Sequence, residues 1–372
     1  MFTSSFLPTI GGLQYQVKWL AEGIAEHGEQ VYLLTPNDAS AYIEQKNGFP
    51  KNVNLEFGKS HFLNIIKVRK AIQHIKPDVV HVPSVIPDGF YAVIATFSMN
   101  VPIVITSHGI DIVTIKEIGY GYRLNPIYAM IIKAVLRRCN KHVVVSESMM
   151  PFAIDAGSSM DRLCKIHDIA PPGKRNISTR AIEKVRKKYN INNSKTILTL
   201  SGMRPIKGLE YLIRAMPIVL EKNPDTRLLM TCRGEYEDHI RNLVLKMGMQ
   251  DNVDFIGFIE GEEKDVLTCI CDVFCMPSLY ESFGIAILDV MRYGTAVVAS
   301  DTGGIPEIIE NGKNGLLCKP KDHVQLAESI NALLEDTELN RRIGVAGKSS
   351  MHRFNVERIS DEYITIYEEV VK

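Results

Sequence analysis

The sequence predicts an α/β protein made of two doubly wound domains with parallel sheets. Its 372 residues exceed one ordinary domain and suit two. Short apolar runs alternate with amphipathic helical stretches along the chain, which is typical of parallel sheets covered by helices. Two consecutive prolines and a glycine at residues 171–173 would stop both a helix and a strand. We therefore expect the first domain to end at residue 173.

The first domain, residues 1–173, contains four expected strands and an early helix. The strands are residues 31–34, 79–82, 103–106 and 142–146. At residues 13–27 apolar side chains recur at helical spacing and share one face. Only residues 1–5 precede the first turn, so the opening strand is either very short or incomplete. A missing central strand would leave its neighbours with unpaired backbone groups.

The second domain, residues 174–350, opens with a basic helix around Lys184, which we interpret as a solvated face. Five apolar runs are its expected strands: residues 196–201, 228–231, 253–256, 273–276 and 296–300. The last segment, residues 351–372, has apolar residues at helical spacing. We expect it to form a helix that crosses back to the first domain.

Composition limits the classes of partner. Lys plus Arg and Asp plus Glu number 43 each, so the overall field attracts neither nucleic acid nor an anionic surface. Seven cysteines, without paired spacing, indicate a reduced compartment. Cys269, Cys271 and Cys275 lie close together, but no second ligand pair follows at zinc spacing. We interpret them as apolar filler and expect no metal.

The sequence contains no apolar run of membrane-spanning length. Residues 1–8 lack a charged region followed by an apolar one, so we expect no signal peptide. We therefore expect a cytoplasmic protein. Residues 129–141 mix apolar residues with Lys133, Arg137 and Arg138, as a membrane-surface helix does. Packing on the sheet with a solvated basic edge is the main interpretation, and contact with the inner face of the membrane is the alternative.

Ligands of open parallel sheets bind beyond the carboxyl ends of the strands, so residues of unusual composition in those loops are site candidates. Gly11 and Gly12 directly precede a helix, where glycines let the backbone approach an anion. A plain tight turn explains them equally well. His108 follows the strand at residues 103–106, with Gly109 and Asp111 nearby. His108 is a candidate hydrogen-bond donor to a sugar hydroxyl or a phosphate. A purely structural role for this histidine is the alternative.

Three loops of the second domain carry stronger signals. Arg204 and Lys207 lie in the loop that follows the first strand of this domain. Two cations in this position can neutralise a diphosphate. Incidental surface charge is the alternative interpretation. The loop after residues 273–276 carries Glu281 and runs into a helix expected near Phe283. Free N–H groups of Phe283, Gly284 and Ile285 at the start of this helix would favour binding of an anion. Asp289 lies one turn later, on the same helix face as Ile285. Residues 300–307 repeat the pattern of glycines before a helix, and Pro306 suits an early helical position.

Together these motifs resemble the retaining GT-B glycosyltransferases of family 4. The similarity covers nearly the whole chain in order, and it is most specific at residues 277–307. That stretch looks like the family's Glu-x7-Glu element followed by its Gly-Gly-Ile-Pro-Glu loop. The resemblance implies two Rossmann-like domains facing across a cleft. It also implies a hexosyltransferase-type enzyme that moves a sugar from a nucleotide-diphosphate sugar to an acceptor hydroxyl of a glycan, glycolipid or small molecule.

The resemblance also implies roles for individual residues. Arg204 and Lys207 would hold the donor phosphates, and Glu281 would contact the transferred sugar. Asp289 stands where the family binds the ribose hydroxyls, and His108 would touch the sugar or phosphate from the first domain. The expected catalytic group is therefore Glu281, His108, Arg204 and Lys207. The other expected donor-binding residues are Gly11, Gly12, Gly257, Phe258, Phe283, Gly284, Ile285 and Asp289.

Neither a cofactor nor a catalytic metal is expected by this resemblance, and front-face attack by the acceptor is the implied mechanism. Three features depart from the family: Asp289 replaces its second glutamate, residues 232–234 lack its usual glycine pair, and the first strand is short. Two other functions stay open. One is a nucleotide-sugar epimerase of the same fold, and the other is a catalytically silent nucleotide-sugar-binding protein.

Overall fold

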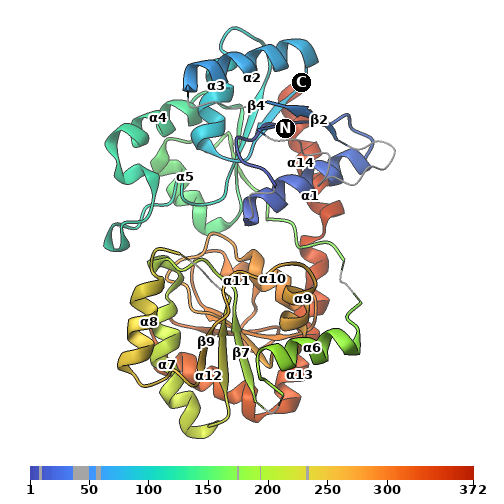
Figure 1. Ribbon diagram of the computed structural model, residues 1–372. Helices are drawn as coiled ribbons and strands as arrows, with labels where there is room; N and C mark the ends of the chain where they lie inside the picture. Colours follow the sequence, from blue (N-terminus) through green and yellow to red (C-terminus); the bar gives the residue numbers. More distant parts are fainter. Residues whose placement is uncertain (8–10, 37–49, 56–59, 174–175, 193, 232–233) are drawn as a thin grey trace. The chain divides into compact units, whose positions relative to one another are not determined.

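The computed structural model describes residues 1–7, 11–36, 50–55, 60–173, 176–192, 194–231 and 234–372. Internal contacts divide the chain into two compact units (Figure 1). Unit 1 comprises Met1–Ile169 and Phe354–Lys372, and unit 2 comprises Ala170–Arg353. Each unit contains a parallel sheet with covering helices, so the predicted α/β class is confirmed. The functional assignment of residues 1–173 and 174–350 stays a prediction.

Unit 1 is built on parallel strands in the order β2-β1 and β3-β4-β5-β6. Its strands are β1 Tyr32–Thr35, β2 Lys51–Asn54, β3 Val80–Val82, β4 Ile103–Ser107, β5 Lys141–Val144 and β6 Leu163–Lys165. Its helices are α1 Gly12–Glu26, α2 His61–Ile75, α3 Phe90–Ala95, α4 Pro126–Leu136, α5 Met150–Ala156 and α14 Val356–Val371.

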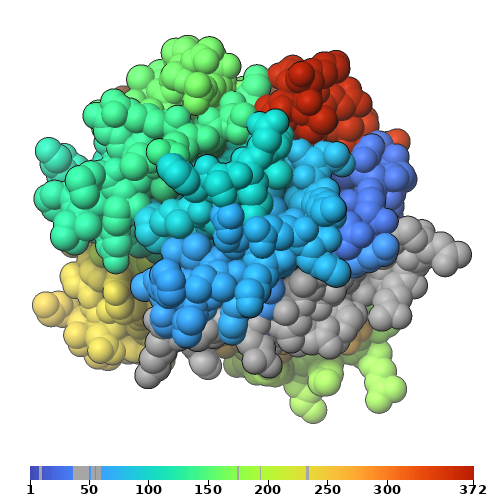
Figure 2. Space-filling model, turned by 90° about the horizontal axis from the view of Figure 1, so that it is seen from above, coloured from blue at the N-terminus to red at the C-terminus, as the bar shows by residue number. Residues whose placement is uncertain are grey.

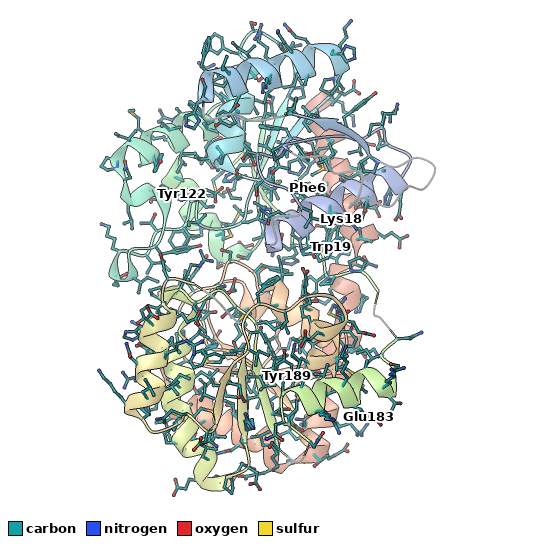
Figure 3. The ribbon with its side chains drawn as sticks, in the orientation of Figure 1. Phe6, Lys18, Trp19, Tyr122, Glu183 and Tyr189 are labelled. Carbon is teal, nitrogen blue, oxygen red and sulfur yellow. The ribbon has the colours of Figure 1, made fainter. Side chains whose placement is uncertain are left out.

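Residues 1–3 join the two groups of strands. Phe2 forms a parallel bridge with Leu34 of β1, and its N–H donates to the carbonyl of His81 in β3 at 2.9 Å. This short extended segment therefore stands where a doubly wound sheet has its central strand. Phe6, which follows this segment and is labelled in Figure 3, is fully buried. In the described residues, this opening segment is very short.

The carboxyl-terminal helix α14 packs beside α1 in unit 1 (Figure 1). Ile359, Tyr363 and Ile366 of α14 join one buried cluster with Leu20 and Ile24 of α1. These residues recur at helical spacing on two facing helices, which explains why both segments form amphipathic helices. Residues near the carboxyl terminus also reach the surface of unit 1, where Figure 2 shows them in red.

Unit 2 contains a six-stranded parallel sheet in the order β12-β11-β10-β7-β8-β9. Its strands are β7 Thr196–Thr199, β8 Arg227–Met230, β9 Val253–Phe255, β10 Val273–Met276, β11 Ala296–Ser300 and β12 Leu316–Cys318. Its helices are α6 Thr179–Lys188, α7 Leu209–Lys222, α8 Glu237–Lys246, α9 Gly261–Ile270, α10 Ile285–Met291, α11 Ile305–Ile308, α12 His323–Glu335 and α13 Thr337–Ser350.

The central strands of unit 2 are mainly apolar because helices cover both of their faces. Every residue of β10 and β11 is buried. Since β10 lies between β7 and β11, the loops that leave these three strands emerge next to one another at the carboxyl edge of the sheet. This order brings together loops that are far apart in sequence.

Two sequence expectations need correction. The helix expected at residues 129–141 ends at Leu136, so Arg137 and Arg138 follow it and Lys141 opens β5. The helix expected near Phe283 begins at Ile285, because Gly284 adopts a positive φ of 118° that a helix does not contain. Within the described part of the chain, no helix is long and apolar enough to cross a membrane.

Candidate functional site

The best-defined polar contact at the carboxyl edge of unit 2 joins Lys207 and Glu281. The Lys207 Nζ donates to Glu281 Oε2 at 2.6 Å, and the two side chains are only 16% and 15% exposed. Lys207 ends a short 3₁₀ turn after β7, and Glu281 lies in the loop after β10. Ser278 Oγ also donates to Glu281 Oε2, at 3.4 Å. Glu281 is therefore held as a hydrogen-bond acceptor by its neighbours.

A backbone hydrogen bond joins the loop that carries Lys207 to the loop that carries Glu281. The Leu279 N–H donates to the Ile206 carbonyl at 2.8 Å. Gly208 has a φ of 59°, and a Cβ on it would lie 2.1 Å from the Pro277 carbonyl oxygen. Only glycine fits such a left-handed position with so close an approach. Gly208, directly after Lys207, is therefore required by the close packing of these two loops.

The loop after β11 supports Glu281 from the other side. Gly304 N–H donates to the Glu281 carbonyl at 2.8 Å. The preceding Gly303 has a φ of 58°, and a Cβ there would lie 1.9 Å from that same carbonyl oxygen. Thr302 Oγ1 donates to the Leu279 carbonyl at 3.1 Å. Loops from three adjacent strands therefore fix one carboxylate.

Arg204, Gly284 and Ile285 lie in the same loops. Arg204 immediately precedes the turn that carries Lys207, and its side chain is exposed. Gly284 precedes α10, and Ile285 is its first residue. Phe283 is only 1% exposed, so its ring packs in the core. The order of the strands brings the loops of these residues together.

Asp289 lies one helical turn further along α10, in a network of charges. Lys264 Nζ of α9 donates to Asp289 Oδ2 at 2.6 Å. Arg292 lies 3.0 Å from Asp289 Oδ1 and forms a hydrogen bond with Asp265 at 2.6 Å. The Arg292 contact with Asp289 lacks hydrogen-bond geometry, and the buried Oδ1 has no hydrogen-bond partner among the described residues. Sequence reasoning missed Lys264, because nothing distinguishes it from the other charged residues at 262–265.

Gly257 and Phe258 follow β9, at the far edge of the sheet. Gly257 has a φ of 73°, and Phe258 is 52% exposed. Strands β7 and β8 separate β9 from β10, so the structure does not place these residues beside Glu281. An exposed phenyl ring next to a glycine is a flat apolar surface, which suits a base.

The remaining expected residues belong to unit 1. Gly11 is the N-cap of α1, and Gly12 is its first residue. His108 follows β4 and is largely buried, and its Nδ1 lies 3.1 Å from Asp168 Oδ1. Asp168 comes after β6 and is only 5% exposed. Sequence reasoning missed Asp168 because the three-residue strand β6 before it is too short to recognise as a strand.

Asp168 controls the charge of His108. Burial alone would lower the pKa of His108, but the charge of Asp168 and its hydrogen bond raise that pKa above its usual value. Asp111 adds a smaller effect in the same direction. A raised folded-state pKa stabilises the fold below the unfolded pKa, and this contribution is lost as pH rises through the folded pKa.

We expect Asp168→Asn to lower the pKa of His108, because the amide keeps a hydrogen-bond acceptor but removes the negative charge. Titration of the His108 ring by NMR measures this shift. Asp155→Asn is a matched control, since Asp155 is an exposed carboxylate paired with Arg123 in the same unit. An unchanged His108 pKa in the Asp168 variant would contradict this assignment.

No group of three or more His, Cys, Asp or Glu side chains that could hold a metal occurs among the described residues. Cys271 and Cys275 are buried, and Cys269 is exposed. Burial raises the pKa of the Cys275 thiol well above its usual value, which suits apolar packing. Cys232 and Arg233 lie outside the described residues.

Comparison with known families and proteins gives one consistent result. A family model described as Glycosyl transferases group 1 matches residues 181–350, and a model for Glycosyltransferase Family 4 matches residues 10–168. An uncharacterized glycosyltransferase of Methanocaldococcus jannaschii is 28% identical, covering 99% of this chain and 97% of the relative. The N-acetyl-alpha-D-glucosaminyl L-malate synthase of Bacillus anthracis is 25% identical, covering 98% and 96%.

Solved structures show the same fold. Anabaena HepE in complex with UDP-glucose matches with a TM-score of 0.81 at 21% identity, covering 99% of this chain and 98% of that one. The sucrose-phosphate synthase of Thermosynechococcus elongatus matches with the same TM-score of 0.81 and 21% identity, over 99% and 98%. The chain is thus a glycosyltransferase with the GT-B fold. It belongs to glycosyltransferase family 4, and it is an enzyme of the hexosyltransferase type.

Proposed function

We propose that this chain is a retaining, metal-independent glycosyltransferase that moves a sugar from a nucleotide-diphosphate sugar to an acceptor hydroxyl. The observation that carries the proposal is the Lys207–Glu281 pair, at 2.6 Å, fixed by loops of three adjacent strands. A partly exposed ammonium paired with a carboxylate at the carboxyl edge of a parallel sheet suits a ligand that has both phosphate and hydroxyl groups.

Sugar transfer separates charge. The anomeric carbon gains oxocarbenium character, and the leaving phosphate gains negative charge, so the enzyme must stabilise that separated state more than the ground state. Lys207 and Arg204 supply positive charge for the phosphate oxygens. Glu281 supplies an acceptor for a sugar hydroxyl. Rigid loops keep these groups in place, so little reorganisation accompanies the reaction.

Front-face attack, with the departing phosphate accepting the proton of the acceptor, fits the surroundings of Glu281. Its Oε2 already accepts hydrogen bonds from Lys207 and Ser278, which lowers its nucleophilicity. A covalent route would need a free carboxylate behind the anomeric carbon. Mass spectrometry of enzyme quenched during turnover tests this point, since a glycosyl adduct on Glu281 would refute front-face attack.

The proposal assigns donor binding to unit 2 and most acceptor contacts to unit 1, where His108 contributes a positively charged or neutral donor. A relative of known structure supports a nucleotide-sugar donor: Anabaena HepE was solved with UDP-glucose. No metal step is part of the proposed mechanism. Turnover that persists in excess EDTA is the expected result, and its complete loss with recovery on adding Mg²⁺ would overturn metal independence.

A nucleotide-sugar epimerase and a silent binding protein are the competing functions. Screening several nucleotide sugars with a panel of hydroxyl acceptors separates them. A transferase releases nucleoside diphosphate only when an acceptor is present, and its product keeps the anomeric configuration of the donor. Conversion of the donor sugar without acceptor would indicate an epimerase, and donor binding without any conversion would indicate a silent protein.

We expect Asp289→Glu to preserve or improve donor affinity if the carboxylate faces the ribose. The longer side chain restores the reach of the family's usual glutamate, and it can keep the contact with Lys264. Calorimetric titration with the donor measures the effect, with Asp289→Ala as the comparison. A loss of affinity as large in Asp289→Glu as in Asp289→Ala would contradict a ribose contact.

A further inference from the structure

A lysine–aspartate pair joins helices α9 and α10 of unit 2 near the ends where both helices begin. Lys264 lies in the first turn of α9, and Asp289 lies one turn after Ile285, the first residue of α10. Lys264 Nζ donates to Asp289 Oδ2 at 2.6 Å, and Figure 1 shows the two helices beside each other. Each helix follows a strand of the parallel sheet, so the pair lies toward the carboxyl edge that carries Lys207 and Glu281.

The Asp289 carboxylate is held between two cations. Its Oδ1 atom is buried and lies 3.0 Å from the Arg292 guanidinium, whereas its Oδ2 atom accepts from Lys264. Arg292 is fixed in turn, because it donates to Asp265 at 2.6 Å and to the Asp289 backbone carbonyl at 3.1 Å. The Lys264 side chain is 27% exposed, and that of Asp289 is 13% exposed. The ammonium is therefore the more exposed group of the pair.

Lys264 keeps hydrogen-bond donors that no residue in the described part of the chain uses. An ammonium has three N–H donors, and Asp289 is the one acceptor of Lys264 Nζ among the described residues. The preceding Glu263, by contrast, is committed to Lys188 of α6. The Asp289 Oδ2 atom also has a second lone pair. The pair thus presents donors and an acceptor side by side.

The position of the pair matches the ribose of a nucleoside diphosphate. The loop before α10 carries Glu281, beside the lysine proposed to hold the diphosphate. The loop before α9 carries Phe258, whose half-exposed ring suits a base. In a nucleoside diphosphate the ribose joins the diphosphate to the base, so the pair that joins the two helices stands where the ribose would lie. Each ribose hydroxyl can both donate and accept a hydrogen bond.

We propose that Lys264 is a ribose-binding residue of the donor site. Its ammonium donates to the oxygen of one ribose hydroxyl, and Asp289 Oδ2 accepts from the neighbouring hydroxyl. Arg292 and Asp265 fix the carboxylate and, through it, the ammonium. A deoxyribose would leave these groups desolvated without a partner, so the pair selects ribonucleotide donors. This role of Lys264 rests on the nucleotide-diphosphate donor proposed above, and it adds a cation to the part of the site that reads the diol.

Calorimetric titration of wild type and Lys264→Met with paired nucleotides tests this role. The probes are UDP, GDP and ADP, each beside its 2′,3′-dideoxy analogue, which lacks both ribose hydroxyls. Methionine keeps most of the length of the lysine stem but removes its three donors. We expect Lys264→Met to weaken binding of the ribonucleotide about tenfold and to change binding of the dideoxy analogue by less than about twofold.

A second variant keeps the test informative if removal of the charge beside Asp289 prevents folding. Lys264→Arg retains a positive charge and N–H donors, so it should fold. Its guanidinium should also retain a preference for the ribonucleotide that Lys264→Met lacks.

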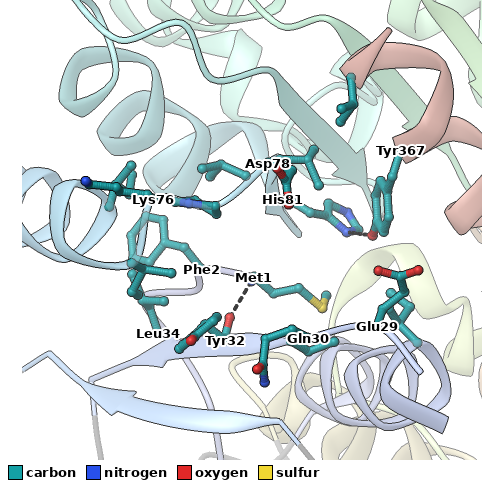
Figure 4. Close-up of a pocket in the computed structure, with 18 of the residues that line it drawn as sticks. Met1, Phe2, Glu29, Gln30, Tyr32, Leu34, Lys76, Asp78, His81 and Tyr367 are labelled. Carbon is teal, nitrogen blue, oxygen red and sulfur yellow. Dashed lines mark hydrogen bonds between the residues drawn. The ribbon is translucent and has the colours of Figure 1, made fainter. Parts of the chain in front are cut away.

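Two controls separate binding from stability. Lys188→Met removes an exposed lysine that also pairs with a carboxylate of α9, Glu263. Tyr367→Phe removes a hydrogen bond within unit 1, where the Tyr367 hydroxyl lies 2.6 Å from His81 Nδ1 (Figure 4). Both variants should bind the ribonucleotide and its dideoxy analogue with wild-type affinity, whatever the change in melting temperature.

An equal loss of affinity for the ribonucleotide and its dideoxy analogue in Lys264→Met would overturn the proposal, because Lys264 would then act without touching the diol. Unchanged binding of both would overturn it as well. In either case wild type still binds a nucleotide, so the proposed donor stands. Binding of none of the three nucleotides to wild type would instead overturn the proposed donor itself, and the role of Lys264 with it.

Discussion

Lys207→Ala should reduce sugar transfer about a hundredfold or more, because it removes a fixed positive group from the phosphate of the developing leaving group. Lys207 is only 16% exposed and its ammonium lies 2.6 Å from Glu281, so the positive charge is held at a fixed place. Initial rates of nucleoside diphosphate release at saturating acceptor measure the effect. Circular dichroism and the melting temperature establish that the fold is kept.

Lys313→Ala is the matched control for Lys207→Ala. Lys313 is also a lysine of unit 2 that pairs with a glutamate, Glu310, at 2.7 Å, but the two side chains are 69% and 55% exposed. An exposed pair of this kind contributes little, so this variant should transfer sugar at the wild-type rate. Retention of most activity by Lys207→Ala would contradict its phosphate role.

Gly303→Ala should have a similarly large effect, although Gly303 has no functional group. Its φ of 58° is unfavourable for alanine by about 1–2 kcal/mol, and the new Cβ would lie 1.9 Å from the Glu281 carbonyl oxygen. The loop must therefore shift and carry Glu281 with it. A displacement of about 1 Å at a reacting site can reduce the rate roughly a hundredfold.

The control for Gly303→Ala is Gly312→Ala. Gly312 also has a positive φ, 76°, but no described atom would lie within 4 Å of a Cβ added to it. This variant should lose stability from backbone strain and keep its rate of transfer. If both alanine variants lost activity equally, displacement of Glu281 would not be the cause.

Apolar patterning predicted most of the sheet. Strands β10 and β11 match the expected residues 273–276 and 296–300, because strands buried on both faces leave an unbroken apolar run. The pattern missed the short strands β6 and β12 but found β3 and β9, which also have three residues each. So short a run has no recognisable period, and its detection depends on the residues that flank it.

Part of the candidate site was also predictable. Glycines before turns and charged residues after apolar runs marked the loops of Lys207 and Glu281, since these loops leave neighbouring strands. The pairing of Asp168 with His108 and of Lys264 with Asp289 was not predictable, because each depends on how separate elements pack. A sequence pattern identifies residues near a strand end, whereas the partner of each side chain is set by tertiary structure.

The central claim is that Lys207 and its neighbours bind a diphosphate. The most direct measurement is the melting temperature of wild type and Lys207→Ala with UDP, GDP or ADP added, since a ligand that binds the folded state raises it. The account predicts that at least one nucleotide stabilises the wild type and that Lys207→Ala loses most of this shift. An equal shift in both proteins, or no shift of the wild type with any of the three, would contradict it.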